Sequence, residues 1–293
     1  MKRIHILPGI GDVANGLVVI ARLLAKEQSD AEVVDLYGNM CEIYERAVEE
    51  VWIHGMWQPR GWIACNKVLR ARKRLVRMTH GSLSPICLKQ QGRWKKWLVG
   101  PIERFFLRRA DVVVATCQAE AEWIRQYEPR VKRVEVTDVK RFFNLNHETH
   151  EMRERKEGKH LHLLYLGRRH PLKGVEFLEA AVREVQSLGE GGQGMTHGCE
   201  LRIVSDAFGA EKERVWEWCD VLVLPTLSEN FGLVVAEALE RGKRVITTDG
   251  APAWGDGNDY GGRLRYLVGY RDGARDMRVK LLKEAIEGMG LEM

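Results

Sequence analysis

Residues 228–239 read SENFGLVVAEAL, and they follow the apolar run VLVLP at residues 221–225. An apolar run, a polar turn with glycine and a second apolar stretch predict a strand, a turn and a helix. Parallel α/β sheets bind ligands at such strand ends, where the N–H groups of a helix start favour a phosphate. Glu229 lies in this turn, and Glu237 lies about two helical turns later. The apolar surroundings of Glu237 predict a partner for it, because burying an unpaired carboxylate costs several kcal/mol.

The alternation of strands and helices extends over the whole chain. Apolar runs predict strands at residues 3–7, 31–37, 51–55, 74–81, 110–116, 131–137, 161–167, 201–205, 220–225 and 244–249. Helices are predicted at residues 17–27, 41–51, 118–127, 174–188, 210–218, 233–242 and 276–289. This order is typical of doubly wound α/β units with parallel sheets.

A charged stretch without an apolar face, NHETHEMRERKEGKH at residues 146–160, indicates a linker between two such units. We therefore expect an N-terminal domain at 1–148, a linker at 149–160, a C-terminal domain at 161–275 and a final helix at 276–293. Only about a dozen residues separate LRIVS (201–205) from CDVLVLP (219–225), so the second domain is expected to be short.

Composition narrows the class of protein. Hydrophobic residues at 45% and charged residues at 30% fit a globular chain rather than a disordered one. The six cysteines are scattered singly without a CxxC pair, which argues against a zinc ribbon or a redox motif. The start of the chain does not resemble a signal peptide, and no run approaches the ~20 apolar residues that span a bilayer. We expect a cytoplasmic protein.

Two segments carry a family resemblance. Residues 225–252, PTLSENFGLVVAEALERGKRVITTDGAP, and residues 166–180, LGRRHPLKGVEFLEA, closely resemble retaining GT-B glycosyltransferases of family 4 (group 1), the type found in lipopolysaccharide and polysaccharide biosynthesis. The N-terminal half, with its Gly-rich turn and MTHG at 78–81, resembles the family's acceptor domain more loosely. The resemblance implies two Rossmann-like parallel-sheet domains that face a cleft, the C-terminal one shortened.

The resemblance also assigns roles to residues. It implies that Glu229 binds the donor sugar, that Glu237 holds the ribose, and that Arg168 and Lys173 stabilise the diphosphate as a leaving group. His80 would lie beside the donor sugar and His54 at a similar strand end, although such histidines are as often structural. The implied catalytic group is His80, Arg168, Lys173 and Glu229; the implied donor-binding group is Gly16 (with Gly9 and Gly11), Asn230, Phe231, Gly232, Leu233 and Glu237. Read without the family, Glu229 is a helix-start carboxylate, Glu237 a solvated helix residue, and Arg168 and Lys173 surface charges.

A basic segment stands out independently of any family. Residues 60–109 hold fourteen Lys or Arg and a single acidic residue, Glu103, interleaved with Trp and Phe. This pattern fits an anionic membrane surface or a nucleic acid, whereas the plain alternative is a solvated basic face. With the family resemblance, we expect membrane or acceptor binding through Arg70, Arg72, Lys73, Arg74, Arg77, Trp94, Lys95, Lys96 and Trp97.

The resulting hypothesis, as the resemblance implies, is a retaining, metal-independent glycosyltransferase that needs no cofactor. Its expected partners are a nucleotide-diphosphate sugar donor, a glycolipid, lipopolysaccharide or polysaccharide acceptor, and the inner face of the plasma membrane. Two alternatives stay open: a non-catalytic nucleotide-sugar-binding or scaffolding protein of the same fold, and a nucleic-acid-binding protein that uses residues 60–109.

Overall fold

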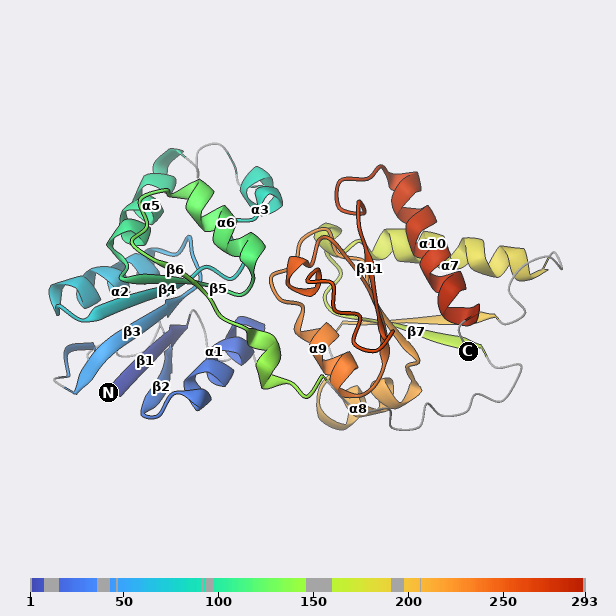
Figure 1. Cartoon of the computed structure of the whole chain (residues 1–293), viewed down its shortest axis with the longest axis horizontal. Coiled ribbons are helices and arrows are strands. Elements are labelled where there is room, and N and C mark those ends of the chain that lie inside the picture. Colours follow the sequence, from blue (N-terminus) through green and yellow to red (C-terminus); the bar gives the residue numbers. More distant parts are fainter. Residues whose placement is uncertain are drawn as a thin grey trace. The chain divides into compact units, whose positions relative to one another are not determined.

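The computed structural model describes residues 2–7, 16–35, 43–45, 47–90, 92, 97–145, 160–190, 198–205 and 207–291. The chain divides into two compact units, Met1–Phe142 and Phe143–Met293. Each unit is a parallel sheet with helices on both faces (Figure 1). The predicted doubly wound α/β architecture is therefore confirmed, and each unit is Rossmann-like.

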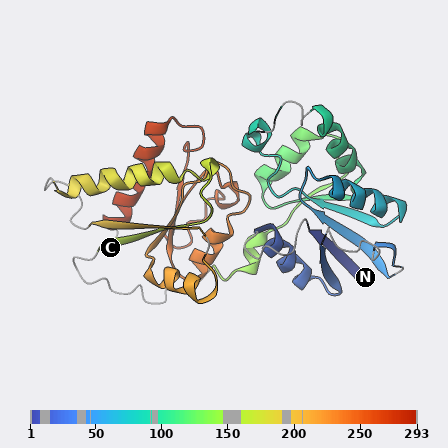
Figure 2. The same ribbon diagram turned by 180° about the vertical axis from the view of Figure 1, so that it is seen from behind.

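The first unit holds a six-stranded sheet in the order β2-β1-β3-β4-β5-β6, in which all pairs are parallel. Helix α1 covers one face, and α2, α5 and α6 cover the other (Figures 1 and 2). The elements are β1 (Lys2–Leu7), α1 (Gly16–Glu27), β2 (Ala31–Asp35), β3 (Val48–His54), α2 (Pro59–Arg70), β4 (Arg74–Met78), α3 (Pro85–Gln90), α5 (Gly100–Arg109), β5 (Val112–Ala115), α6 (Gln118–Tyr127) and β6 (Val134–Val136). Because β2 and β3 flank β1, the topological switch point lies between β1 and β3.

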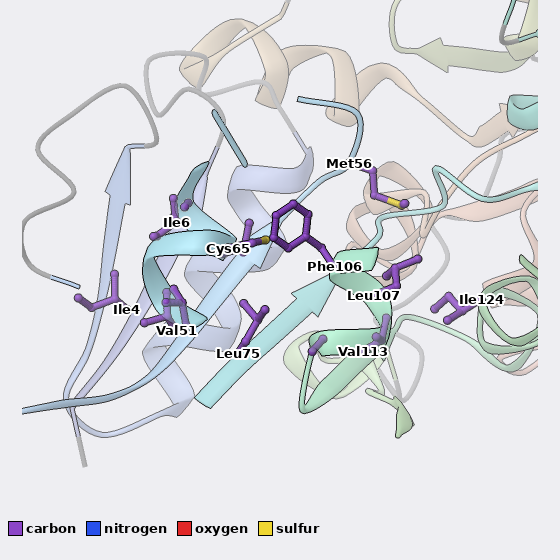
Figure 3. Close-up of a cluster of buried hydrophobic side chains, with 14 of the residues drawn as sticks. Ile4, Ile6, Val51, Met56, Cys65, Leu75, Phe106, Leu107, Val113 and Ile124 are labelled. Atoms are coloured by element: carbon purple, nitrogen blue, oxygen red, sulfur yellow. The ribbon is translucent and has the colours of Figure 1, made fainter. Parts of the chain in front are cut away.

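Alternating side chains of these strands build a different core on each face. Ile4, Ile6 and Leu75 point to the face that α2 and α5 cover, where they pack with Cys65 and Phe106 (Figure 3). The smaller cluster under α1 consists of Leu7, Val18 and Ala21, with Leu17 and Val33 packed against it. The central strands β1, β3, β4 and β5 are thus largely buried on both faces, as in other parallel sheets.

The second unit holds a five-stranded parallel sheet in the order β11-β10-β9-β7-β8. Helices α7 and α10 pack together on one face, and α8 and α9 cover the other (Figure 1). The elements are β7 (Leu161–Leu166), α7 (Val175–Glu190), β8 (Cys199–Val204), α8 (Gly209–Trp218), β9 (Val221–Leu224), α9 (Leu233–Glu240), β10 (Arg244–Thr248), β11 (Leu264–Leu267) and α10 (Arg275–Leu291). Here the switch point lies between β7 and β9.

The sequence prediction differs from the structure in several elements. The helix expected at 41–51 is wrong in its second half, because Val48–Val51 belong to β3, where packing against β1 and β4 outweighs helix propensity. Helices α2, α3 and α5 and strand β11 were not predicted at all. Of the expected linker, residues 149–159 lie outside the described residues. Within the part of the chain that the structure describes, no helix is long and apolar enough to cross a membrane.

Candidate functional site

The carboxyl edge of the second sheet brings Lys173 and Glu229 together. Lys173 ends a short 3₁₀ turn, Pro171–Lys173, that follows β7, and Glu229 lies in the turn after β9. The Lys173 ammonium donates a hydrogen bond to the Glu229 carboxylate. The two side chains keep 23% and 22% of their surface exposed, so the ion pair remains open to a ligand.

Close backbone contacts hold this ion pair in place. Gly174 adopts φ 65°, and a Cβ there would lie 2.2 Å from the carbonyl oxygen of Pro225. Only glycine therefore allows the turn after β7 to approach the end of β9 so closely. The Leu227 N–H donates to the Leu172 carbonyl at 2.8 Å, which joins the two turns directly.

The predicted donor-binding turn leads into the N-terminus of α9. Gly232 is its N-cap residue, adopts φ 73° and offers no side-chain cap. The first turn of α9, which begins at Leu233, contains no acidic residue. The Asn230 N–H donates to Glu229 Oε1 at 3.1 Å. The helix start is thus an uncapped positive dipole end beside the ion pair, an arrangement that favours an anion.

Phe231 serves this turn as a buried anchor. Its side chain is 1% exposed and packs between Phe143 and Trp254, with ring centroids at 6.2 Å and 5.2 Å. The indole N–H of Trp254 donates to the Phe231 carbonyl. Its side chain therefore fixes the turn, and only its backbone N–H is left for a ligand.

Glu237, in α9, and Arg168, just after β7, are the two other charged residues predicted to bind the donor. The Glu237 carboxylate has the partner that its apolar surroundings predict, because Lys212 of α8 places its ammonium 2.9 Å from Oε1 and 2.7 Å from Oε2. Arg168 is exposed just beyond β7, and its carbonyl accepts a hydrogen bond from the Tyr165 hydroxyl at 2.8 Å. No described carboxylate forms an ion pair with the Arg168 guanidinium.

In the first unit, His80 ends a chain of three hydrogen-bonded imidazoles. His80 Nε2 lies 2.9 Å from His54 Nδ1, and His54 Nε2 lies 2.9 Å from His5 Nδ1. We call His5, His54 and His80 the histidine chain. It runs from the middle of β1 across the end of β3 to the loop after β4, at the switch point of this sheet.

A buried carboxylate fixes the backbone of His80. This residue adopts φ 50°, a strained value for a side chain other than glycine. Glu120, fully buried in α6, accepts hydrogen bonds from the Thr79 hydroxyl at 2.6 Å and the Gly81 N–H at 2.5 Å, on either side of His80. It also accepts from the N–H and hydroxyl of Thr116, both at 2.8 Å. Four donors thus compensate the buried charge and clamp the loop.

Burial keeps the histidine chain neutral. Loss of hydration lowers the pKa of His5 to about 4 and that of His80 to about 3. It also lowers the pKa of His54 well below its usual value, and the neighbouring His80 and His5 lower it further. The described residues include no cluster of three or more His, Cys, Asp or Glu side chains that could hold a metal ion.

One residue of the basic segment, Arg77, lies in the core and not on the surface. Arg77 is 1% exposed and forms an ion pair with the fully buried Glu103 at 3.2 Å. Its guanidinium also donates to the Gly55 carbonyl at 3.0 Å, and the Trp62 indole donates to Glu103 at 2.9 Å. The expectation that Arg77 contacts a membrane is wrong, because Arg77 neutralises the single acidic residue of the segment inside the core.

Other members of the segment do lie on the surface. A hollow of about 570 Å³ at the amino edge of the first sheet is lined by Leu69, Arg72, Lys73, Arg74, Arg109, Asp111 and Lys132. Arg70 ends α2 nearby, and Trp97, just before α5, is 78% exposed. Trp94, Lys95 and Lys96 lie outside the described residues, as do Gly9 and Gly11, whereas Gly16 begins α1.

Sequence reasoning missed His5, Gln28, Glu120 and Lys212. His5 and His54 lie on the neighbouring strands β1 and β3 at positions that face α1, so the alternation of side chains along each strand could have placed them on one face. Glu120 and Lys212 left no comparable signal, because a carboxylate or an ammonium in an amphipathic helix usually faces water.

Comparisons with known proteins agree with this architecture. Residues 40–139 match the family described as Glycosyl transferase 4-like domain, and residues 160–283 match Glycosyl transferases group 1. The two matches together span about three-quarters of the chain. No curated protein sequence matches it.

Solved structures with similar folds come from sugar-phosphate synthases. A UDP-forming α,α-trehalose-phosphate synthase from Burkholderia xenovorans, in complex with glucose-6-phosphate, has a TM-score of 0.64 at 9% identity, covering 100% of this chain and 92% of that one. A sucrose-phosphate synthase from Thermosynechococcus elongatus has a TM-score of 0.58 at 15% identity, with coverages of 99% and 90%. A structure from E. coli, described as trehalose-6-phosphate bound with UDP-2-fluoro glucose, has a TM-score of 0.59 at 11% identity, with coverages of 98% and 91%.

The chain is therefore a glycosyltransferase of the GT-B fold. Within that class, its first unit carries the glycosyltransferase 4-like domain and its second unit the group 1 domain.

Proposed function

We propose that this glycosyltransferase moves a sugar, with retention of configuration, from a nucleotide-diphosphate donor to a glycolipid or polysaccharide acceptor at an anionic membrane surface. One observation carries the donor half of the proposal. An accessible Lys173–Glu229 ion pair adjoins the uncapped N-terminus of α9 at the switch point of the second sheet. Cation, carboxylate and helix N–H groups match the diphosphate and the sugar hydroxyls of such a donor.

In this proposal, different residues bind the diphosphate, the sugar and the ribose of the donor. Lys173, together with Arg168 and the N–H groups at the start of α9, neutralises the diphosphate and stabilises it as it leaves. Glu229 exchanges Lys173 for sugar hydroxyls, which donate to its carboxylate. Glu237, steadied by Lys212, accepts hydrogen bonds from the ribose hydroxyls.

Transfer needs no covalent intermediate on the protein. The bond between the anomeric carbon and the diphosphate breaks, the acceptor hydroxyl bonds to the same face of that carbon, and its proton passes to the departing phosphate oxygen. Positive charge from Arg168 and Lys173 takes the place of a metal ion in this scheme. The solved structure described as bound with UDP-2-fluoro glucose supports a UDP-sugar as the first donor to test.

The donor site is tested by calorimetric titration of UDP, GDP, ADP and TDP sugars into the wild type and Glu229→Gln. The variant should bind the preferred nucleotide sugar at least tenfold more weakly, because an amide cannot replace both acceptor oxygens. Glu213→Gln is the matched control, since Glu213 is 57% exposed and its one ion pair among the described residues is with surface Arg241. Equal affinities in all three proteins would remove Glu229 from the donor site. Binding without transfer to any acceptor, glucose-6-phosphate included, would favour the non-catalytic alternative.

The membrane half of the proposal rests on the outer face of α5. Ile102 and Phe105, three residues apart, form an exposed apolar stripe on this helix, and the exposed Leu98 lies just before the helix begins at Gly100. Trp97 adjoins it, and Arg109 places its guanidinium 5.1 Å from the Phe105 ring. An apolar stripe bordered by cations is typical of helices that lie in the headgroup region of anionic bilayers.

Sedimentation with vesicles tests this surface. Wild type should sediment with phosphatidylglycerol vesicles and not with phosphatidylcholine vesicles, and the double variant Ile102→Asp/Phe105→Asp should stay in solution. Phe208→Asp is the control, because Phe208 is also exposed, at 51%, but lies in the other unit. Salt-dependent binding to RNA instead of vesicles would favour the nucleic-acid alternative.

A further inference from the structure

The histidine chain begins at an amide and ends at an unpartnered nitrogen. Gln28, directly after α1, places Oε1 3.1 Å from His5 Nε2. From there the hydrogen bonds pass through His54 to His80 Nε2, each at 2.9 Å. His80 Nδ1 is buried and has no hydrogen-bond partner among the described residues. Four side chains, from the residue after α1, from β1, from β3 and from the loop after β4, thus form one line.

The chemistry of neutral imidazole gives this line a direction. Each neutral ring has one N–H donor and one acceptor nitrogen. Because the Gln28 oxygen can only accept, His5 carries its proton on Nε2 and accepts at Nδ1. His54 must then donate from Nε2 to His5, and His80 must donate from Nε2 to His54. The free electron pair of His80 consequently lies on Nδ1.

We propose that Gln28, acting through His5 and His54, sets the tautomer of His80, so that His80 Nδ1 accepts a hydrogen bond from a hydroxyl of a sugar substrate. His5, His54 and Gln28 are positioning residues, since none of them needs to touch the ligand. The assignment of a sugar to this nitrogen rests on the proposed function. The direction of the chain does not, because it follows from contacts within the first unit.

Two features of the site agree with such a fixed acceptor. Burial keeps all three rings neutral, so that a tautomer and not a charge is transmitted along the chain. Glu120 holds the His80 backbone on both sides, so ring and loop are fixed before a ligand arrives. An acceptor held in this way loses little freedom when a hydroxyl binds it.

The test is nitrogen NMR on the full chain labelled with ¹⁵N-histidine, without ligand, at pH 7.5. All three rings of the wild type should show the proton on Nε2. Gln28→Lys replaces the acceptor by a donor-only ammonium, so the chain should reverse and the proton of His80 should move to Nδ1. Gln28→Leu removes the terminal hydrogen bond and should give a mixture of both tautomers at His80. His162, in the other unit beside Asp220, is the internal control and should not change.

A His80 proton on Nδ1 in the wild type would overturn the proposal. The proposal would also be overturned if His80 gave the same spectrum in the wild type and in Gln28→Leu. Gln28→Leu is the variant to use if Gln28→Lys does not fold. The functional readout is binding of UDP-glucose and of UDP: Gln28→Leu should weaken UDP-glucose about tenfold and leave UDP unchanged. Wild-type tautomers as expected, without UDP-glucose binding, would contradict the proposed function and not the histidine chain.

Discussion

The carboxyl edges of the two sheets use polar side chains in opposite ways. In the first unit, Glu120, His5 and His54 are buried and hydrogen-bond within the protein, and His80 is part-buried. In the second unit, Lys173–Glu229 and Lys212–Glu237 leave about a quarter of each side chain exposed. The first edge is fixed in advance, whereas the second consists of charge pairs that a ligand can separate. The first unit therefore offers a preformed, rigid edge, and the second unit offers charges that can change partners.

The largest expected effect concerns a charge buried in the first unit. Glu103→Ala should lower the free energy of unfolding by about 3–5 kcal/mol, because it leaves the Arg77 guanidinium buried without its carboxylate. Glu135→Ala, which removes an exposed partner of Arg133, should cost at most about 1 kcal/mol. Urea denaturation of both variants measures the difference. Similar losses would show that the first unit does not depend on its buried charges.

A smaller effect concerns pH. Histidine in the unfolded chain has a pKa of about 6.5, whereas burial, as the largest cause, lowers that of His80 to about 3. Burial is also the largest cause that lowers the pKa of His5. The hydrogen bond to Gln28 and the charge of Glu50 raise this pKa, and the charge of Arg3 lowers it. The unfolded state therefore binds protons that the folded state excludes. Stability should be complete above about pH 6.5 and fall as the pH decreases towards 4.

His80→Asn isolates one contribution to this pH dependence, because asparagine tolerates positive φ but does not titrate. Between pH 7.5 and pH 5.0 the wild type should lose about 1–2 kcal/mol more unfolding free energy than the variant. Urea denaturation at both pH values provides the measurement. Equal losses would mean that His80 is not held neutral in the folded state.

The smallest effect on stability is expected in the second unit. Lys173→Ala leaves a partly exposed carboxylate that water can solvate, so the free energy of unfolding should change by at most about 1 kcal/mol. Binding of UDP-glucose should nevertheless fall at least tenfold. Thermal denaturation and calorimetric titration measure the two quantities separately. A large loss of stability would place Lys173–Glu229 with the buried, structural charges of the first unit.

The sequence predicts the parts of this site that lie close to a glycine turn after a strand. SENFGLVVAEAL and LGRRHPLKG identified Glu229 and Lys173, and the structure joins them. It did not identify Lys212 as the partner of Glu237, because the two residues are 25 positions apart on different helices. Arg77 was assigned to the surface because a basic segment does not reveal which of its members meets Glu103 in the core. Hydrogen bonds across strands, such as those of the histidine chain, require the sheet order, which one sequence does not contain.

The exchange of partners that we propose at Lys173–Glu229 has a consequence for turnover. A nucleotide sugar supplies phosphates for Lys173 and hydroxyls for Glu229, so both charges find new partners. After transfer, the departing nucleoside diphosphate still neutralises Lys173, but it leaves the Glu229 carboxylate facing phosphate oxygens without a hydroxyl between them. Repulsion between these like charges weakens the hold on the spent nucleotide. As Lys173 returns to Glu229, the ion pair helps to expel the product and resets the enzyme for the next donor.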